Sequence, residues 1–167
     1  MKKIITLVMV LVAALALGAC SLGESSKLED YRATLYFANE EYIITGSEDL
    51  EKLIPEERDI QTTEESLGMD ILQELKKGSE NPELETLIPE TSKVLDVKIE
   101  NALATVNFAR EGLNGSSMEE AFTINQIVAT LLELDEVDRV QFLVDGEVAE
   151  SLMGHFDTTQ AFEDTVD

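Results

Sequence analysis

The N-terminus places the strongest constraint on what this chain can fold into. Lys2 and Lys3 are followed by residues 4–19, which carry no charge and are mostly apolar. A short basic segment followed by an apolar run is typical of a secretory signal peptide. The run is shorter than the roughly 20 apolar residues that a membrane-spanning helix needs, and no charged stop-transfer segment follows it at residues 21–23. We therefore expect residues 1–19 to be a cleaved signal peptide.

The end of this segment, residues 17–20 (LGAC), resembles the lipobox of bacterial lipoproteins. In a lipobox, small residues precede a cysteine that receives a diacylglycerol thioether and becomes the new N-terminus. The resemblance implies lipidation of Cys20 with two or three acyl chains, such as palmitate, which together give stable membrane attachment. The alternative is a core cysteine that happens to follow an apolar run. We expect a lipid-anchored protein on the extracytoplasmic face of the cell membrane, without disulfides, because Cys20 is the only cysteine.

The charge balance excludes several classes of partner. The chain has 12 Lys and Arg against 35 Asp and Glu, a net charge of −23, and loss of the signal removes two of the lysines. Nucleic acids and anionic lipid surfaces are bound by clusters of Lys and Arg, and the sequence has none. We therefore expect no nucleic-acid partner. The acids are scattered, which indicates a solvated surface or, as a sharper alternative, adaptation to salty or alkaline surroundings.

The chain divides into four segments. Residues 1–19 are the signal peptide, and residues 20–29 form a lipidated N-terminus with a short polar tether. Residues 30–162 have the length of one domain. Residues 163–167 form an acidic tail that we expect to be frayed.

The first strands are predicted by alternation of apolar and polar residues. Residues 33–37 have the period of a half-buried strand. A loose acidic stretch is expected at residues 42–50. Residues 53–60 contain a short second strand, which Pro55 restricts to a sheet edge or strand start.

The first helix is predicted between a cap and a glycine. Thr62 and Glu65 match a capping box, and the helix runs from there to about Lys77, where Gly78 ends it. Its apolar face consists of Leu67, Ile71, Leu72 and Leu75.

A hairpin and a second helix follow. Residues 95–99 and 104–108 alternate in polarity and form the clearest β-hairpin. Ser117 and Glu120 match a second capping box, and residues 118–134 form an amphipathic helix. Its apolar stripe consists of Ala121, Ile124, Ile127, Val128, Leu131 and Leu134.

The last strand is predicted at residues 140–144, followed by a turn at Asp145 and Gly146. This order of elements predicts an α+β fold. We expect a small mixed β-sheet with the two amphipathic helices packed on one face, because that arrangement buries both apolar stripes.

Several segments, taken in order, resemble the GerMN domain, which occurs in bacterial sporulation and spore-germination lipoproteins and in other cell-envelope lipoproteins. The matching segments are residues 33–37 (ATLYF), 54–58 (IPEER), 87–90 (LIPE), 94–98 (VLDVK), 104–108 (ATVNF), 125–128 (NQIV), 137–146 (VDRVQFLVDG) and 152–155 (LMGH). The resemblance implies a noncatalytic interaction domain, similar in shape to the ring-building modules of envelope-spanning channels, that works in envelope assembly or spore development. Sporulation members often carry two copies of the domain, and this sequence contains one.

Little in the sequence predicts catalysis or metal binding. His155 is the only histidine, so it would have to carry any catalytic triad or histidine metal site. With Asp157 it offers two ligands, which bind zinc weakly. We instead expect its imidazole to bond the backbone where the chain turns at Gly154. No cofactor, metal or catalytic residue is predicted.

Three side chains are candidate partner contacts, namely Tyr36, Arg58 and His155. The alternative for Arg58 is an internal ion pair next to a loop. The leading functional interpretation is an envelope interaction module that associates with a partner protein or with itself. A solute- or ion-binding lipoprotein is the alternative and would need a pocket with convergent polar groups. An enzyme of cell-wall metabolism ranks third, since tryptophan is absent from the sequence and no sugar-stacking platform is evident.

Overall fold

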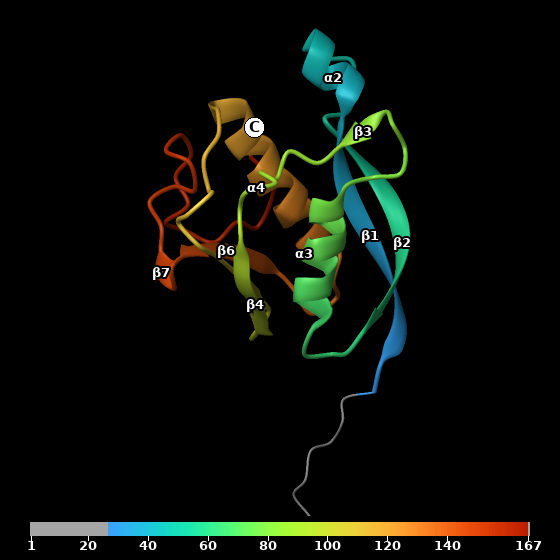
Figure 1. The fold of residues 1–167 in the computed structure, drawn as a ribbon, viewed down its shortest axis with the longest axis vertical. Coiled ribbons are helices and arrows are strands. Elements are labelled where there is room, and N and C mark those ends of the chain that lie inside the picture. Colours follow the sequence, from blue (N-terminus) through green and yellow to red (C-terminus); the bar gives the residue numbers. More distant parts are fainter. Residues whose placement is uncertain (1–26, 167) are drawn as a thin grey trace, which may run out of the picture.

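The computed structural model describes residues 27–166 and confirms the predicted α+β class. The described residues form two β-sheets and three helices (Figure 1). The signal peptide predicted for residues 1–19, the lipidation site at Cys20 and most of the predicted tether lie outside the described residues. None of the helices within residues 27–166 combines the length and apolarity needed to cross a membrane.

The first sheet is antiparallel and has the strand order β2-β1-β3. Its strands are β1 (Glu29–Asn39), β2 (Leu53–Thr62) and β3 (Leu84–Glu85). The alternation predicted at residues 33–37 is confirmed, because Ala33, Leu35 and Phe37 are buried on one face of β1. β2 is longer than the short strand predicted from the sequence, and it lies at the sheet edge.

The second sheet is mixed and has the order β4-β5-β6-β7. Its strands are β4 (Val94–Glu100), β5 (Leu103–Phe108), β6 (Arg139–Val144) and β7 (Glu147–Val148). β4 and β5 are the predicted hairpin, whose turn residues Asn101 and Ala102 have φ of 54° and 60°. β5 and β6 are parallel, which requires the helical crossover between them. The prediction of a mixed sheet is confirmed for these strands, but the prediction of a single sheet with both helices on one face is wrong, because β1 and β2 form a separate antiparallel sheet.

Helices α3 (Leu67–Lys77) and α4 (Ser117–Leu132) lie between the two sheets (Figure 1). The predicted apolar face of α3 is confirmed, since all four of its residues are buried. α4 is buried on more than its predicted stripe. Polar side chains including Thr123, Gln126 and Thr130 are at most 1% exposed, so this helix is enclosed on nearly all sides.

Both predicted capping boxes are wrong. Thr62 is the last residue of β2, and α3 begins at Leu67 without a side-chain cap. In α4 the box is shifted by one residue. Ser116 Oγ accepts from the Glu119 N–H at 3.3 Å, and the Glu119 carboxylate accepts from the Ser116 N–H at 2.8 Å.

The shift in α4 has a physical cause. The sequence contains Ser116-Ser117 and Glu119-Glu120, so the capping pattern fits two registers equally well. The structure buries Glu120 completely, which leaves Glu119 at the helix start. Hydrogen bonds from the backbone and hydroxyl of Ser116 hold the pKa of Glu119 below its ordinary value.

A short helix, α2 (Glu40–Thr45), replaces part of the loose acidic stretch that the sequence predicted. Asn39 caps it by accepting from the Glu41 and Tyr42 N–H groups at 3.0 and 3.4 Å. Gly46 ends it in the left-handed region, with φ of 62°. α2 projects beyond the end of β1 (Figure 1).

The C-terminal segment is tied to the domain rather than frayed through its described part. The Asn125 side chain donates to the Val166 carbonyl at 2.8 Å and accepts from its N–H at 2.7 Å. Upstream, Phe162 exchanges two backbone hydrogen bonds with Val140, at 2.8 and 2.9 Å. These contacts extend the folded part of the chain to Val166.

Candidate interaction site

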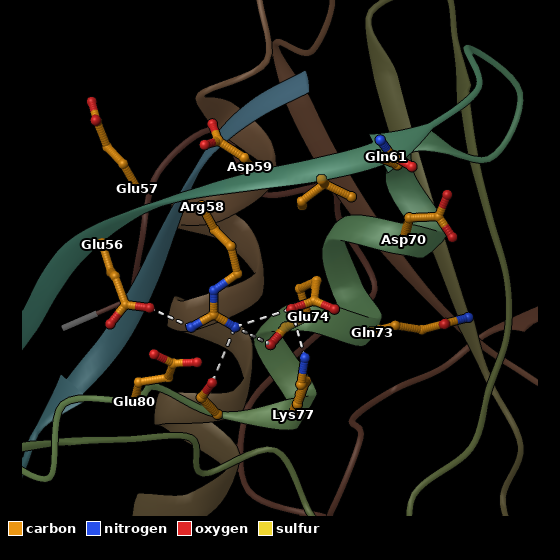
Figure 2. Close-up of a pocket in the computed structure, with 12 residues that line it drawn as sticks. Glu56, Glu57, Arg58, Asp59, Gln61, Asp70, Gln73, Glu74, Lys77 and Glu80 are labelled. Carbon is orange, nitrogen blue, oxygen red and sulfur yellow. Dashed lines mark hydrogen bonds and ion pairs between the residues drawn. The ribbon is translucent and has the colours of Figure 1, made fainter. Parts of the chain in front are cut away.

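A groove of about 700 Å³ lies between β2 and the exposed side of α3 (Figure 2). One wall is a continuous stretch of β2, residues 56–61. The other wall comes from α3 and the loop after it, including Asp70, Glu74, Lys77 and Glu80. Carboxylates outnumber cations among the lining residues, so the groove has a negative potential.

Arg58 crosses this groove from β2 to the C-terminal end of α3 (Figure 2). Its Nη1 donates to the Glu74 carbonyl and carboxylate, both at 3.2 Å, and to the Gly78 carbonyl at 3.1 Å. Its Nη2 pairs with the Glu56 carboxylate, and its guanidinium lies 5.5 Å from the centre of the Phe37 ring. The structure therefore places Arg58 in an internal ion-pair network that binds terminal carbonyls of α3.

Tyr36 lies on β1 and faces α4 rather than the groove. Its hydroxyl donates to Glu133 Oε1 at 2.7 Å. This hydrogen bond, followed by burial and the charge of Glu133, raises the pKa of Tyr36 above its ordinary value. Its main-chain N–H also donates to Thr130 Oγ1 at 3.0 Å.

His155 lies in the loop after β7. Its imidazole Nε2 is 3.3 Å from the Gly115 carbonyl, and its main-chain N–H donates to Glu120 Oε2 at 2.7 Å. The three candidate residues therefore do not converge on one site. Tyr36 contacts the C-terminal end of α4, His155 the N-terminal end, and Arg58 lies in the groove. Contact of any of them with a partner stays a prediction.

Two functional features of α4 were missed from the sequence. Glu120 is a fully buried carboxylate that accepts from the N–H groups of Leu152, Met153 and His155, at 2.9, 2.8 and 2.7 Å. Gln126 is a fully buried amide that bonds three main-chain groups. The available signal was a set of polar residues on several sides of an otherwise apolar helix, which indicates an element buried all round.

No cluster of three or more His, Cys, Asp or Glu side chains that could hold a metal ion occurs within residues 27–166. The polar side chains described above mainly join elements of the fold to one another. Together they define a small two-sheet α+β domain with an acidic groove along one sheet edge.

A family model described as sporulation and spore germination matches residues 34–150. The chain belongs to this family, the Germane family, which agrees with the resemblance to the GerMN domain inferred from the sequence. Among curated proteins, no match to the chain was found.

Three solved structures share the fold. A protein from Clostridium perfringens, described as a candidate lipoprotein, is 28% identical with a TM-score of 0.55, and the match covers 80% of this chain and 87% of that one. The tandem GerMN domains of the sporulation protein GerM from Bacillus subtilis match at 23% identity and a TM-score of 0.58, covering 87% of this chain and 48% of the tandem. The first GerMN domain of GerM matches at 15% identity and a TM-score of 0.59, covering 81% and 96%.

Proposed function

We propose that this protein is a lipid-anchored, noncatalytic interaction module that acts outside the cytoplasm in assembly of the cell envelope, in sporulation or germination. The observation that carries the proposal is the order of segments. A lipobox at residues 17–20 precedes a domain of the sporulation and spore germination family at residues 34–150. The structural similarity to the Clostridium perfringens protein supports the lipoprotein assignment.

The candidate side chains are hydrogen-bonded to other groups of the fold, which supports a noncatalytic role. A catalytic acid, base or nucleophile needs a reactive atom that can reach substrate. Arg58 makes four hydrogen bonds to groups of the fold, and its side chain is only 16% exposed. The Tyr36 hydroxyl is bonded to Glu133, and His155 is joined to Gly115 and Glu120.

The groove itself favours a second candidate function, a binder of small cationic solutes. Its volume of about 700 Å³ lies within the usual range of small-molecule pockets, and carboxylates outnumber cations in its lining. Spermidine at millimolar concentration would then raise the melting temperature of the protein. An unchanged melting temperature would favour the interaction module.

Mass spectrometry of the N-terminal peptide from native membranes tests the anchor. We expect a peptide that begins at Cys20 and carries a diacylglycerol, with or without a third acyl chain. Cys20→Ala should abolish both modification and cleavage, whereas Ser21→Ala is the matched control and should be processed normally. An unmodified Cys20 in the mature protein would overturn the proposal that Cys20 carries a lipid anchor.

Crosslinking in intact cells tests the interaction role. We expect the wild-type protein to form crosslinks to an envelope protein or to a second copy of itself. If it crosslinks to neither under conditions that capture other lipoproteins, the interaction module is contradicted.

A further inference from the structure

The open edge of β2 has a defined set of exposed main-chain groups, which Tyr36 on the neighbouring strand determines. The Tyr36 N–H donates to Thr130 Oγ1 at 3.0 Å and its carbonyl accepts from Gln126 Nε2 at 3.3 Å, so both groups point away from β2. The residue opposite Tyr36 is Pro55. In an antiparallel pair of this kind, the main-chain groups of Pro55 point to the open edge. No strand pairs with β2 there, so the missing N–H of proline costs no hydrogen bond.

The same orientation repeats along β2. The register runs without a shift from Ala38↔Leu53 to Glu29↔Thr62. Every second residue after Pro55, namely Glu57, Asp59 and Gln61, therefore directs its N–H and C=O to the open edge. Within residues 27–166 no backbone partner for these groups is found. Their spacing matches the hydrogen-bonding repeat of an extended peptide, which can add to such an edge as a further strand.

The other sheet edges are less suited to strand addition. β4 has a register shift between Val94 and Asp96, and such bulges interrupt pairing. β3 and β7 contain two residues each. β2 is thus the longest regular edge in the described part of the chain.

Charge complementarity identifies the occupant. The open edge forms one wall of the acidic groove, so side chains of an added strand that face α3 would meet Glu56, Glu74 and Glu80. Side chains on the opposite face would meet Glu57 and Asp59, which project from β2 away from α3 (Figure 2). A second copy of β2 would place its own acids against these, and like charges across strands are destabilising.

We propose that the edge of β2 binds an extended segment of a partner protein that carries Lys or Arg at alternate positions and adds to the sheet as a strand. This inference rests on the proposed interaction function and names the class of partner. The main-chain groups of Glu57, Asp59 and Gln61 supply the pairing, and the acidic groove supplies the selectivity for a basic strand.

Synthetic peptides of about eight residues, the length of an ordinary strand, test the inference on the full-length protein in detergent micelles. One peptide alternates Lys with Thr, and a second has Glu in place of each Lys. A third keeps the lysines but has its central backbone amides N-methylated. We expect only the first to bind well, with the methylated peptide weakened about 10-fold or more through loss of backbone hydrogen bonds. Equal binding of the first and third peptides would mean simple charge attraction and would overturn strand addition, as would no binding of the first.

Amide hydrogen exchange gives a second readout with residue resolution. On binding of the Lys/Thr peptide, the amides of Glu57, Asp59 and Gln61 should gain protection, while those of Arg58 and Ile60, which already face β1 in the ladder, should change little. Protection that does not alternate along β2 contradicts the proposed geometry.

Charge-reversal variants locate the site. The groove variant, Asp59→Lys with Glu80→Lys, alters one carboxylate on each face of the open edge, Glu80 on the α3 side and Asp59 on the opposite side. Neither makes a hydrogen bond or ion pair among the described residues. The matched control is Glu147→Lys with Glu150→Lys, at exposed positions near β7 that give the same change in net charge. We expect about 10-fold weaker peptide binding for the groove variant than for the control. Equal weakening in both variants would show nonspecific attraction.

The same variants separate this inference from the proposed function. If the wild-type protein forms envelope crosslinks in cells and the Asp59→Lys, Glu80→Lys variant keeps them unchanged, the β2 inference fails and the interaction module stands. If those crosslinks disappear only in the groove variant, both are supported.

Discussion

The side-chain amide of Gln126 on α4 donates a hydrogen bond to the main-chain carbonyl of Tyr36 on β1, at 3.3 Å. The same Nε2 donates to the Glu85 carbonyl at 3.1 Å, and Oε1 accepts from the Leu87 N–H at 2.8 Å. Gln126 is fully buried. Its side chain therefore joins the free edge of β1 to the end of β3 and to the segment that follows β3.

Gln126→Leu should lower the free energy of unfolding by about 3 kcal/mol, because it leaves three part-buried main-chain groups without their partner. Urea denaturation measures the change. Gln73→Leu, at an exposed position of α3, is the matched control and should change stability little. Equal effects of the two substitutions would contradict the bridging role of Gln126.

Glu120→Ala should release the loop that follows β7. The three N–H groups bound by this carboxylate would lose their acceptor, and we expect a loss of about 3 kcal/mol. Hydrogen exchange should show the amides of Leu152, Met153 and His155 losing protection ahead of the rest of the domain. Glu147→Ala, at an exposed residue, serves as control. Unchanged protection of these amides in Glu120→Ala would contradict the role of Glu120 in holding the loop.

Arg58→Lys should destabilise the domain although it keeps the charge. A lysine ammonium cannot reproduce the fork in which Arg58 Nη2 pairs with Glu56 while Nη1 bonds Glu74 and the Gly78 carbonyl, and we expect a cost of about 2 kcal/mol. The matched control is Arg32→Lys, since Arg32 pairs with Glu57 at the surface and its side chain is 67% exposed. Surface pairs of this kind contribute about 0–1 kcal/mol. Thermal unfolding of both variants makes the comparison, and similar melting temperatures would argue against the Arg58 network.

The hydrogen bond between Tyr36 and Glu133 should make stability fall at alkaline pH. The pKa of Tyr36 is raised in the folded state, first by this bond, then by burial and by the charge of Glu133. The neutral phenol therefore stabilises the fold at pH below about 10, and this contribution is lost as pH rises from there through the raised pKa. The advantage of the wild type over Tyr36→Phe in urea should accordingly shrink as pH is raised.

Glu133→Gln is the control for this pH dependence, because it removes the negative charge beside the phenol. Spectroscopic titration of the tyrosines should then find the pKa of Tyr36 closer to its ordinary value than in the wild type. A wild-type advantage over Tyr36→Phe that stays constant into the alkaline range would rule out the coupling.

Much of the secondary structure was predictable from local sequence pattern. Alternation located β1, the hairpin of β4 and β5, and β6, because a strand with one buried face repeats every two residues. The edge position of β2 was also predictable, since Pro55 has no N–H to donate to a neighbouring strand. The helix starts were not, because Ser116 and Ser117 fit the same capping pattern and the choice depends on where Glu120 is buried.

The candidate site was predictable only in part. Arg58 was identified, and its internal ion pair was one of the two alternatives stated. Its partners at Glu74 and Gly78 were not identified, because they lie 16 and 20 residues away along the chain and meet Arg58 only once α3 has packed against β2.

The sequence by itself determined the α+β class, the family, the apolar faces of the helices and the acidic character of the surface. Those properties follow from residue type and short-range periodicity. The tertiary structure decided that the strands divide into two sheets and that β2 keeps an open edge. On the side of β1 away from β2, Thr130 and Gln126 bond the main chain of Tyr36 across separations of 94 and 90 residues. No local pattern encodes such a contact, because it stabilises the fold only when folding brings a distant side chain next to a main-chain group that has no other partner.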